Sequence, residues 1–194
     1  MTVNVRPLRR GDPAIGILVL CGFGAVWYAL ADLLASPTVP AALAAAVPGA
    51  VVLALLLRAA LRFRASEKSR AAVTSDEPAS EERRAAIGRR FAIVNVLQWV
   101  AIVLAIVAAN ALHVPERILN LVELIVGLHF FPLARLFGAP EYNVTAAAMC
   151  VAALAGFALR GDAGALFGTA SACAILWATA TYVLMRSFRT SAWA

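Results

Sequence analysis

Apolar stretches recur along the chain at lengths that suit a lipid bilayer, and short polar segments separate them. An α-helix needs about 20 mostly apolar residues to cross the hydrocarbon core. The predicted membrane spans cover residues 13–36, 41–63, 88–111, 116–137, 143–160 and 163–185. We therefore predict an all-α polytopic membrane protein, with residues 1–194 forming a single integral membrane domain. The six helices would form a bundle arranged as three helical hairpins.

One polar segment, residues 64–87, interrupts the apolar pattern at greater length. It is too short and too poor in apolar residues to form a core of its own, so we expect a cytoplasmic polar loop. Ser80 followed by Glu81 and Glu82 is typical of a helix start, because a hydroxyl caps free N–H groups and acids favour the first turn. We expect a helix from about Ser80 that continues into the third span.

The fourth span carries more polar groups than the others, namely Asn120, Glu123, His129 and Arg135. At about 100° per residue, Asn120 and Glu123 share one helix face and His129 lies nearly opposite. A carboxylate in hydrocarbon costs about 2.5–3.5 kcal/mol, so Glu123 must face protein or water. We expect Glu123 to be protonated near neutral pH, or to share a proton with Asp32, because burial penalises the charged form.

Helix direction and residue rise predict which polar groups lie at the same depth. Asp32, Asn110, Asn120 and Glu123 all fall near the outer end of the bundle, which predicts an outer cluster able to hold a proton or a cation. The alternative is structural. In that case Asp32 reaches interfacial water, and a neutral Glu123 forms a hydrogen bond with an asparagine.

A second, inner layer would contain Asn95, Gln98, Trp99 and His129, with Arg135 near the exit. A histidine beside amides can relay protons, gate a pore or bind a polar solute. The alternative is that His129 bonds to Gln98 or to a backbone carbonyl, and that the amides only join helices.

Two further helical patterns concern packing. In the third span, a stripe at intervals of three and four predicts one inward face; it consists of Asn95, Trp99, Ile102, Ile106 and Asn110. In the fifth and sixth spans, small residues recur every four positions; they are Ala148, Ala152 and Gly156, then Gly164, Gly168 and Ala172. Small residues let helix backbones approach, so we expect the last two spans to pack tightly against each other.

Composition agrees with a membrane protein: 62% of the residues are hydrophobic, 14% are charged, and the mean hydropathy is +0.83. These values exclude an ordinary soluble domain and a disordered chain. The net charge of +6 does not indicate nucleic-acid binding, because the basic residues flank the apolar spans. We expect them to contact anionic lipid headgroups at the cytoplasmic face.

The placement of basic residues also predicts the orientation in the membrane. With six spans, Arg117 and Arg160 fall on one side, and the other fifteen Lys and Arg residues fall on the side of both termini. Positive loops stay in the cytoplasm, so we predict a multi-pass protein of the bacterial inner membrane with both termini cytoplasmic.

The motifs of several enzyme classes are absent from the sequence. It contains no GxSxG nucleophile, HExxH pair, CxxC pair or Walker loop, and its three cysteines lie in apolar runs. We therefore predict neither a metal nor a cofactor, and an enzymatic function is disfavoured.

The stretch GLHFFPLARLF, residues 127–137, resembles a motif of small, uncharacterised bacterial integral membrane proteins of similar length. The resemblance implies no activity. It implies only that His129, Pro132 and Arg135 belong together.

The leading functional hypothesis is a small channel or transporter for protons, cations or a small polar solute, because the polar layers lie at two depths. One alternative is a non-catalytic membrane interaction or sensor subunit, and another is an intramembrane enzyme with His129 as base. Assembly into a homo-oligomer is compatible with each. A water-lined cavity that joins the layers would favour transport, whereas a dry bundle with an exposed groove would favour the interaction subunit.

Overall fold

The computed structural model describes residues 13–36, 38, 47, 49–62, 79–159 and 161–191, and every regular element among them is helical. The helices are α1 (Pro13–Ala35), a helix over residues 49–62, α3 (Ala79–Ala111), a short 3-10 helix η1 (Pro115–Arg117), α4 (Ile118–Phe137), α5 (Glu141–Ala158) and α6 (Asp162–Ser191).

Five helical stretches in the described part of the chain are long and apolar enough to cross a membrane. They indicate a multi-pass membrane protein, as the hydropathy pattern predicted. Of the predicted span 41–63, residues 47 and 49–62 are helical, and the rest of it lies outside the described residues. The predicted loop 64–87 is described only from residue 79, where α3 begins. The helix expected from about Ser80 is thus confirmed.

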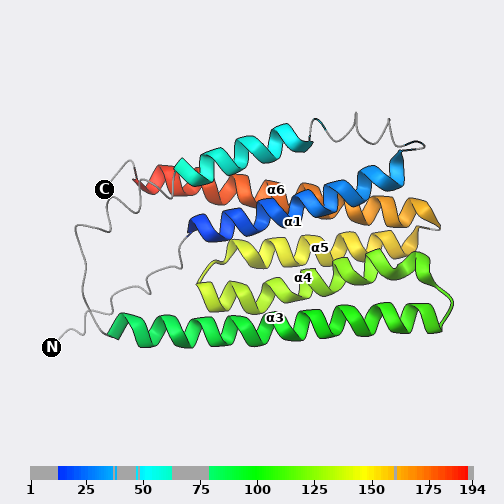
Figure 1. Ribbon diagram of the computed structural model, residues 1–194, viewed down its shortest axis with the longest axis horizontal. Coiled ribbons are helices and arrows are strands. Elements are labelled where there is room, and N and C mark those ends of the chain that lie inside the picture. Colours follow the sequence, from blue (N-terminus) through cyan, green and yellow to red (C-terminus); the bar gives the residue numbers. More distant parts are fainter. Residues whose placement is uncertain are drawn as a thin grey trace.

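The helices run side by side: α1, α3 and α5 point one way, and the helix over residues 49–62, α4 and α6 point the other way (Figure 1). α4 contacts α3, α5 and α6, whereas α1 packs chiefly on α6. Among the described helices, the α1–α6 contact is the most extensive, yet it joins the first and last long helices. The arrangement as three helical hairpins is therefore not confirmed.

The contact between α1 and α6 is built around Trp177. Its ring stacks on Tyr28 with a centroid separation of 5.5 Å, and its Nε1 donates a hydrogen bond to the carbonyl of Cys21, 3.3 Å away. A side-chain carbon on Gly24 would overlap the indole ring. A glycine at this position therefore lets the large aromatic residue lie flat on α1.

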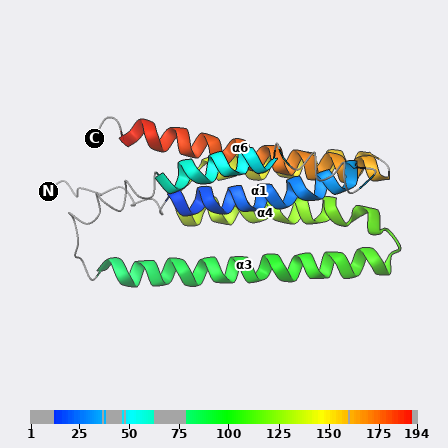
Figure 2. The same cartoon turned by 45° about the horizontal axis from the view of Figure 1, so that its top comes forward.

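α3 lies at the periphery of the bundle, set apart from the other helices in Figure 2. Its inward face contains Gln98, Ile102 and Ala109, which are all buried. Trp99 is 56% exposed and Asn110 is also exposed, so the predicted stripe does not face inward as a whole. The buried face of α3, which lies against α4, is therefore rotated from the predicted one.

α4, the helix with the most polar residues, continues through Pro132 to Phe137. It ends at Gly138, whose φ of +60° is a left-handed conformation that glycine adopts without strain. The ring of Phe137 packs against Phe91 of α3, with centroids 5.9 Å apart. This contact fixes the register of the two antiparallel helices, so residues one turn further along each helix lie at the same depth.

Candidate functional site

Asn120 and Glu123 lie three residues apart on α4 and point into the bundle. Asn120 is 1% exposed and Glu123 is 0% exposed. Their spacing puts both side chains on the helix face that packs against α5 and α6. The sequence predicted that these two residues share a face, and the structure brings them together.

Three glycines from the neighbouring helices make the space for these side chains. A side-chain carbon on Gly168 of α6 would lie 2.5 Å from Asn120 Oδ1 and 2.8 Å from Glu123 Oε2. On Gly156 of α5, it would lie 2.8 Å from the same Asn120 oxygen. On Gly164, it would overlap the carbonyl oxygen of Gly156 and lie 3.5 Å from Asn120 Nδ2. The small-residue ridges of α5 and α6 thus contact each other and also receive the polar residues of α4.

The Glu123 carboxyl has one hydrogen-bond partner among the described residues, the hydroxyl of Ser171 on α6. Ser171 Oγ lies 3.2 Å from Glu123 Oε1, 2.7 Å from the carbonyl oxygen of Phe167 and 2.9 Å from that of Gly168. A hydroxyl has a single hydrogen, so these three acceptors compete for it. The shortest distance favours donation to Phe167.

Two buried oxygens remain without a hydrogen-bond partner in the described part of the chain, Glu123 Oε2 and Asn120 Oδ1. A buried acceptor left unsatisfied costs about 1–3 kcal/mol. No arginine or lysine pairs with Glu123 either, since the one salt bridge found among the described residues joins Arg186 and Glu141. We call Asn120, Glu123, Gly168 and Ser171 the Glu123 site.

Asp32, from the predicted outer cluster, lies on α1 and accepts a hydrogen bond from Ser36 Oγ at 3.1 Å. It lines an open groove of about 420 Å³ between α1 and α6, together with Ala170 and Trp177 of α6. The groove residues of α6 lie on the opposite side of that helix from Gly168 and Ser171. Asp32 is therefore at a similar depth to Glu123, but α6 separates the two carboxyl groups.

Asn110, the fourth member of the predicted outer cluster, is exposed near the end of α3. Its Nδ2 donates a hydrogen bond to the carbonyl of Ile106 in its own helix, at 2.8 Å. The structure therefore does not place Asn110 with Asn120 and Glu123.

The predicted inner layer combines residues of α3 and α4. From the register that Phe91 and Phe137 set, Gln98 lies level with His129 and Phe130. Gln98 is buried, Asn95 and His129 are half-buried, and Arg135 is exposed near the end of α4; Trp99 of this layer is exposed, as described above. The inner layer is therefore only partly enclosed by the described helices.

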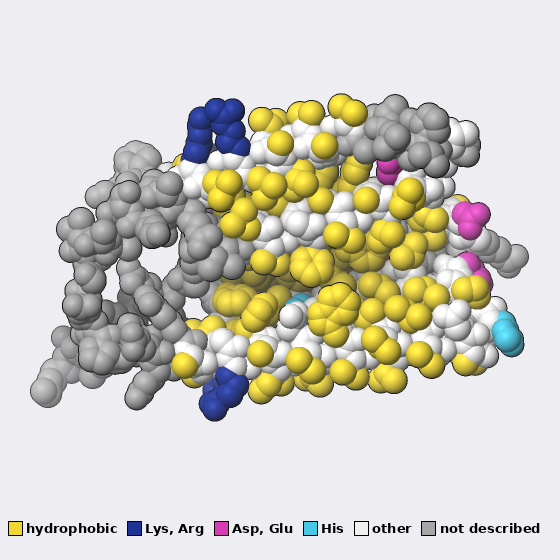
Figure 3. Space-filling view, in the orientation of Figure 1, with side chains coloured by type: hydrophobic (Ala, Val, Ile, Leu, Met, Phe, Trp, Pro, Cys, Tyr) yellow, Lys and Arg dark blue, Asp and Glu magenta, His cyan; other side chains and the backbone are white. Residues whose placement is uncertain are grey.

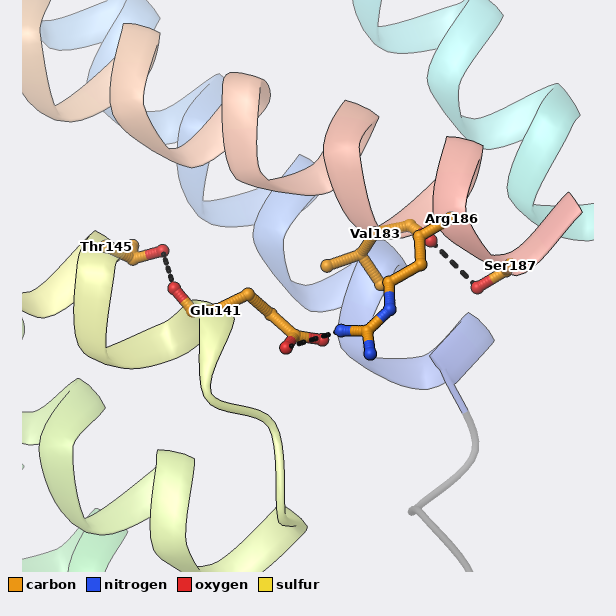
Figure 4. Close-up of polar contacts among 5 residues, drawn as sticks. All are labelled: Glu141, Thr145, Val183, Arg186 and Ser187. Carbon is orange, nitrogen blue, oxygen red and sulfur yellow. Dashed lines mark hydrogen bonds and ion pairs between the residues drawn. The ribbon is translucent and has the colours of Figure 1, made fainter. Parts of the chain in front are cut away.

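A polar contact that the sequence interpretation did not include joins α5 and α6 at the end opposite the Glu123 site. Arg186 Nη1 donates to Glu141 Oε2 at 3.1 Å, as Figure 4 shows. One turn further along α5, the hydroxyls of Thr145 and Thr179 are 2.8 Å apart and both residues are buried. The opposite charges of Glu141 and Arg186 could have suggested this ion pair, but the two residues are 45 positions apart in the sequence, and sequence spacing alone does not bring them together.

Arg117 holds the other end of α5. Its Nη1 donates to the carbonyl oxygens of Phe157 at 2.5 Å and Leu159 at 3.4 Å. The last carbonyls of a helix lack partners within the helix, so a guanidinium satisfies them and also suits the negative end of the helix dipole. This basic residue therefore stabilises the end of α5.

The described residues contain no group of three His, Cys, Asp or Glu side chains close enough to hold a metal ion. Cys21, Cys150 and Cys173 are free thiols within helices. The Glu123 site contains one carboxyl group and one amide group, and each has an oxygen without a hydrogen-bond partner among the described residues. Such a site can bind and release a proton or accept a hydrogen-bond donor.

Residues 87–187, just over half of the chain, match a family of unknown function, DUF7010. The match begins within α3 and ends within α6, so it includes α4 and the whole Glu123 site. No curated protein and no solved structure matches the chain.

Proposed function

The chain belongs to the DUF7010 family of unknown function, and we propose that it is a small multi-pass transporter or channel for protons or other small cations. One observation carries this proposal. Glu123 is a fully buried carboxyl within a membrane-spanning helix, and its Oε2 has no partner among the described residues.

A carboxyl kept only for structure would be expected to have its oxygens satisfied. Leaving a buried acceptor unpaired costs about 1–3 kcal/mol, and an intramembrane acid is costly in itself. Such groups usually mark ion pathways and proton relays in membrane proteins. The unpaired Oε2 of Glu123 and the adjacent Oδ1 of Asn120 therefore support a site whose occupant enters and leaves.

The surroundings of the Glu123 site favour a carrier over an open pore. The groove beside Asp32 and a second groove between the helix over residues 49–62 and α6 both lie at the surface, and neither is lined by Asn120 or Glu123. Glu123 is thus enclosed by α5 and α6 in this conformation. We infer that opening of the contact with α6 would give the site access to water.

A second candidate function is a non-catalytic interaction subunit of a membrane complex or homo-oligomer. The peripheral position of α3 (Figure 2) favours it, together with the many exposed apolar side chains on this helix. In this view Glu123 would only join helices. Ion flux distinguishes the two functions, since an interaction subunit carries no ions alone.

We further propose that both termini lie in the cytoplasm of a bacterial cell, with the protein in its inner membrane. Lys and Arg gather at one end of the apolar band, and acidic residues and a histidine at the other (Figure 3). Arg58 and Arg62, which line the second groove with Phe188, would lie at anionic headgroups of the cytoplasmic leaflet.

Reporter fusions test this orientation. A reporter that is active only in the cytoplasm should be active after Thr74, and inactive after Pro37, Val114 and Gly161. The reason is that basic segments are retained in the cytoplasm, whereas the turns at Val114 and Gly161 lie at the opposite end of the bundle (Figure 1). Cytoplasmic activity at either of those two turns would overturn the proposed orientation.

Flux through the purified protein tests the transport function. Liposomes with a trapped pH dye and an imposed potassium diffusion potential should acidify faster when they contain the protein than when they are empty. Sodium, potassium and small polar solutes are then tested in parallel. No protein-dependent flux across the whole panel would favour the interaction subunit instead.

A further inference from the structure

We propose that the occupant of the Glu123 site is a single proton, carried on Glu123 Oε2 and donated to Asn120 Oδ1. This rests on the proposed transport function and names its substrate as the proton, as opposed to a metal cation. The observation behind it is the convergence of two buried, unpaired oxygens on one point beside Gly168.

We infer a hydrogen between the two oxygens. Both lie within 2.8 Å of the position that a side-chain carbon on Gly168 would take, so they face the same small space. Two acceptors in that arrangement repel each other, whereas an acceptor and a donor attract. An amide oxygen is not protonated near neutral pH, so the carboxyl is the group that can carry the hydrogen.

A metal cation fits this space poorly. Metal ions that prefer oxygen ligands surround themselves with about six or more of them. Here the structure brings together the two carboxyl oxygens of Glu123, Asn120 Oδ1 and the hydroxyl oxygen of Ser171, which is fewer than six, and the backbone of Gly168 occupies the adjacent space. A proton needs no such coordination shell, because it is held by one covalent bond and one hydrogen bond.

Ser171 supplies the complementary half of the site. While Glu123 is neutral, the Ser171 hydroxyl donates to the carbonyl of Phe167, the nearest of its acceptors. When the O–H bond of Glu123 breaks, the proton leaves towards water and a negative carboxylate remains. The Ser171 hydroxyl then turns to donate to Glu123 Oε1, 3.2 Å away, and stabilises the charged form.

Few other titratable groups face this carboxyl. From α5 the thiol of Cys150 is near enough to interact with Glu123 electrostatically. From α6 the facing residues are Gly168 and Ser171, neither of which titrates. The described helices therefore present no basic group that would keep Glu123 ionised.

Dicyclohexylcarbodiimide, an apolar reagent for protonated carboxyls, tests the proposal on the full chain in liposomes. The carboxyl hydrogen passes to a carbodiimide nitrogen while the carboxyl oxygen bonds to its carbon, and an acyl shift then leaves a stable N-acylurea. We expect an adduct on Glu123, located by peptide mass spectrometry, whose yield falls as the pH rises. Saturating sodium, potassium or magnesium at fixed pH should not reduce it.

Two variants sharpen the test because they act on opposite protonation states. Asn120→Leu removes the acceptor of the neutral form, so the labelling midpoint should move to a pH about one unit lower. Ser171→Ala removes a donor to the charged form, so the midpoint should move the opposite way. Glu123→Gln should remove the adduct, and adducts on exposed Glu116 control for reagent access.

The outcomes separate this proposal from the transport function. Protection of Glu123 by a metal cation, or failure to label it anywhere between about pH 5 and pH 9, would overturn the proton site. Shifts of both variants in the same direction would overturn the assigned roles of Asn120 and Ser171. If Glu123 is labelled as expected in liposomes that show no flux, the result supports the proton site and overturns only the transport function.

Discussion

Replacing Gly168 with alanine is expected to destabilise the protein, although alanine is the better helix former. The new methyl carbon would lie 2.5 Å from Asn120 Oδ1 and 2.8 Å from Glu123 Oε2, both closer than carbon and oxygen normally approach. Overpacking of this kind costs about 1–3 kcal/mol, whereas the gain in helix propensity is about 1 kcal/mol. We expect a net loss of stability for Gly168→Ala and no folded protein for Gly168→Leu.

Thermal unfolding in detergent measures the effect, at about 2–4 °C of Tm for each kcal/mol in a chain of this size. Gly22→Ala is the matched control, because a side-chain carbon on Gly22 of α1 meets nothing within 4 Å. Its Tm should stay the same or rise. An unchanged Tm for Gly168→Ala would contradict the close packing of α4 against α6.

A double mutant assigns the clash to its partner. Asn120→Ala removes the side chain whose oxygen lies nearest to the new methyl group. If that contact causes the damage, Gly168→Ala should cost less in the Asn120→Ala background than in the wild type. Equal costs in both backgrounds would show that the two positions do not interact.

The helices could be predicted because the hydropathy of a segment and the rise per residue depend only on that segment and not on its neighbours. Glu123 and Asn120 share a face at any helix rotation, since their spacing of three residues fixes it. The sequence also placed Asp32 and Glu123 at similar depth, and the structure agrees, because both lie level with the stretch of α6 around Ala170. Depth could be counted from the ends of the spans.

The neighbours of each helix could not be predicted in the same way. Asp32 was expected beside Glu123, but α1 packs on the far side of α6. Which helices touch depends on the packing of whole faces, such as the flat contact of Trp177 with Gly24, and spacing within one segment does not encode that. Gly168 shows the same limit. Small residues every four positions predicted that this face of α6 contacts another helix, but they did not identify α4 as one of the helices it contacts.

The rotation of α3 is a further case. Its predicted inward stripe started from Asn95 and Asn110, because polar groups in a span usually face protein. In the structure Asn110 satisfies its amide on the carbonyl of Ile106 in the same helix and stays exposed. A polar residue near a helix end has this option, so its presence alone did not determine the buried face.

Replacing Glu123 with glutamine is expected to abolish proton flux while the protein remains folded. Glutamine has nearly the same size and shape, and its amide nitrogen can donate to Asn120 Oδ1 in place of the carboxyl hydrogen. Stability should therefore be unchanged. A side chain that cannot ionise cannot release a proton, so the dye-loaded liposomes should acidify no faster than empty ones.

Glu116→Gln is the matched control, since it makes the same chemical change on an exposed residue of η1, and it should retain wild-type flux. Wild-type flux in a folded Glu123→Gln protein would show that the conducted proton does not pass through this carboxyl.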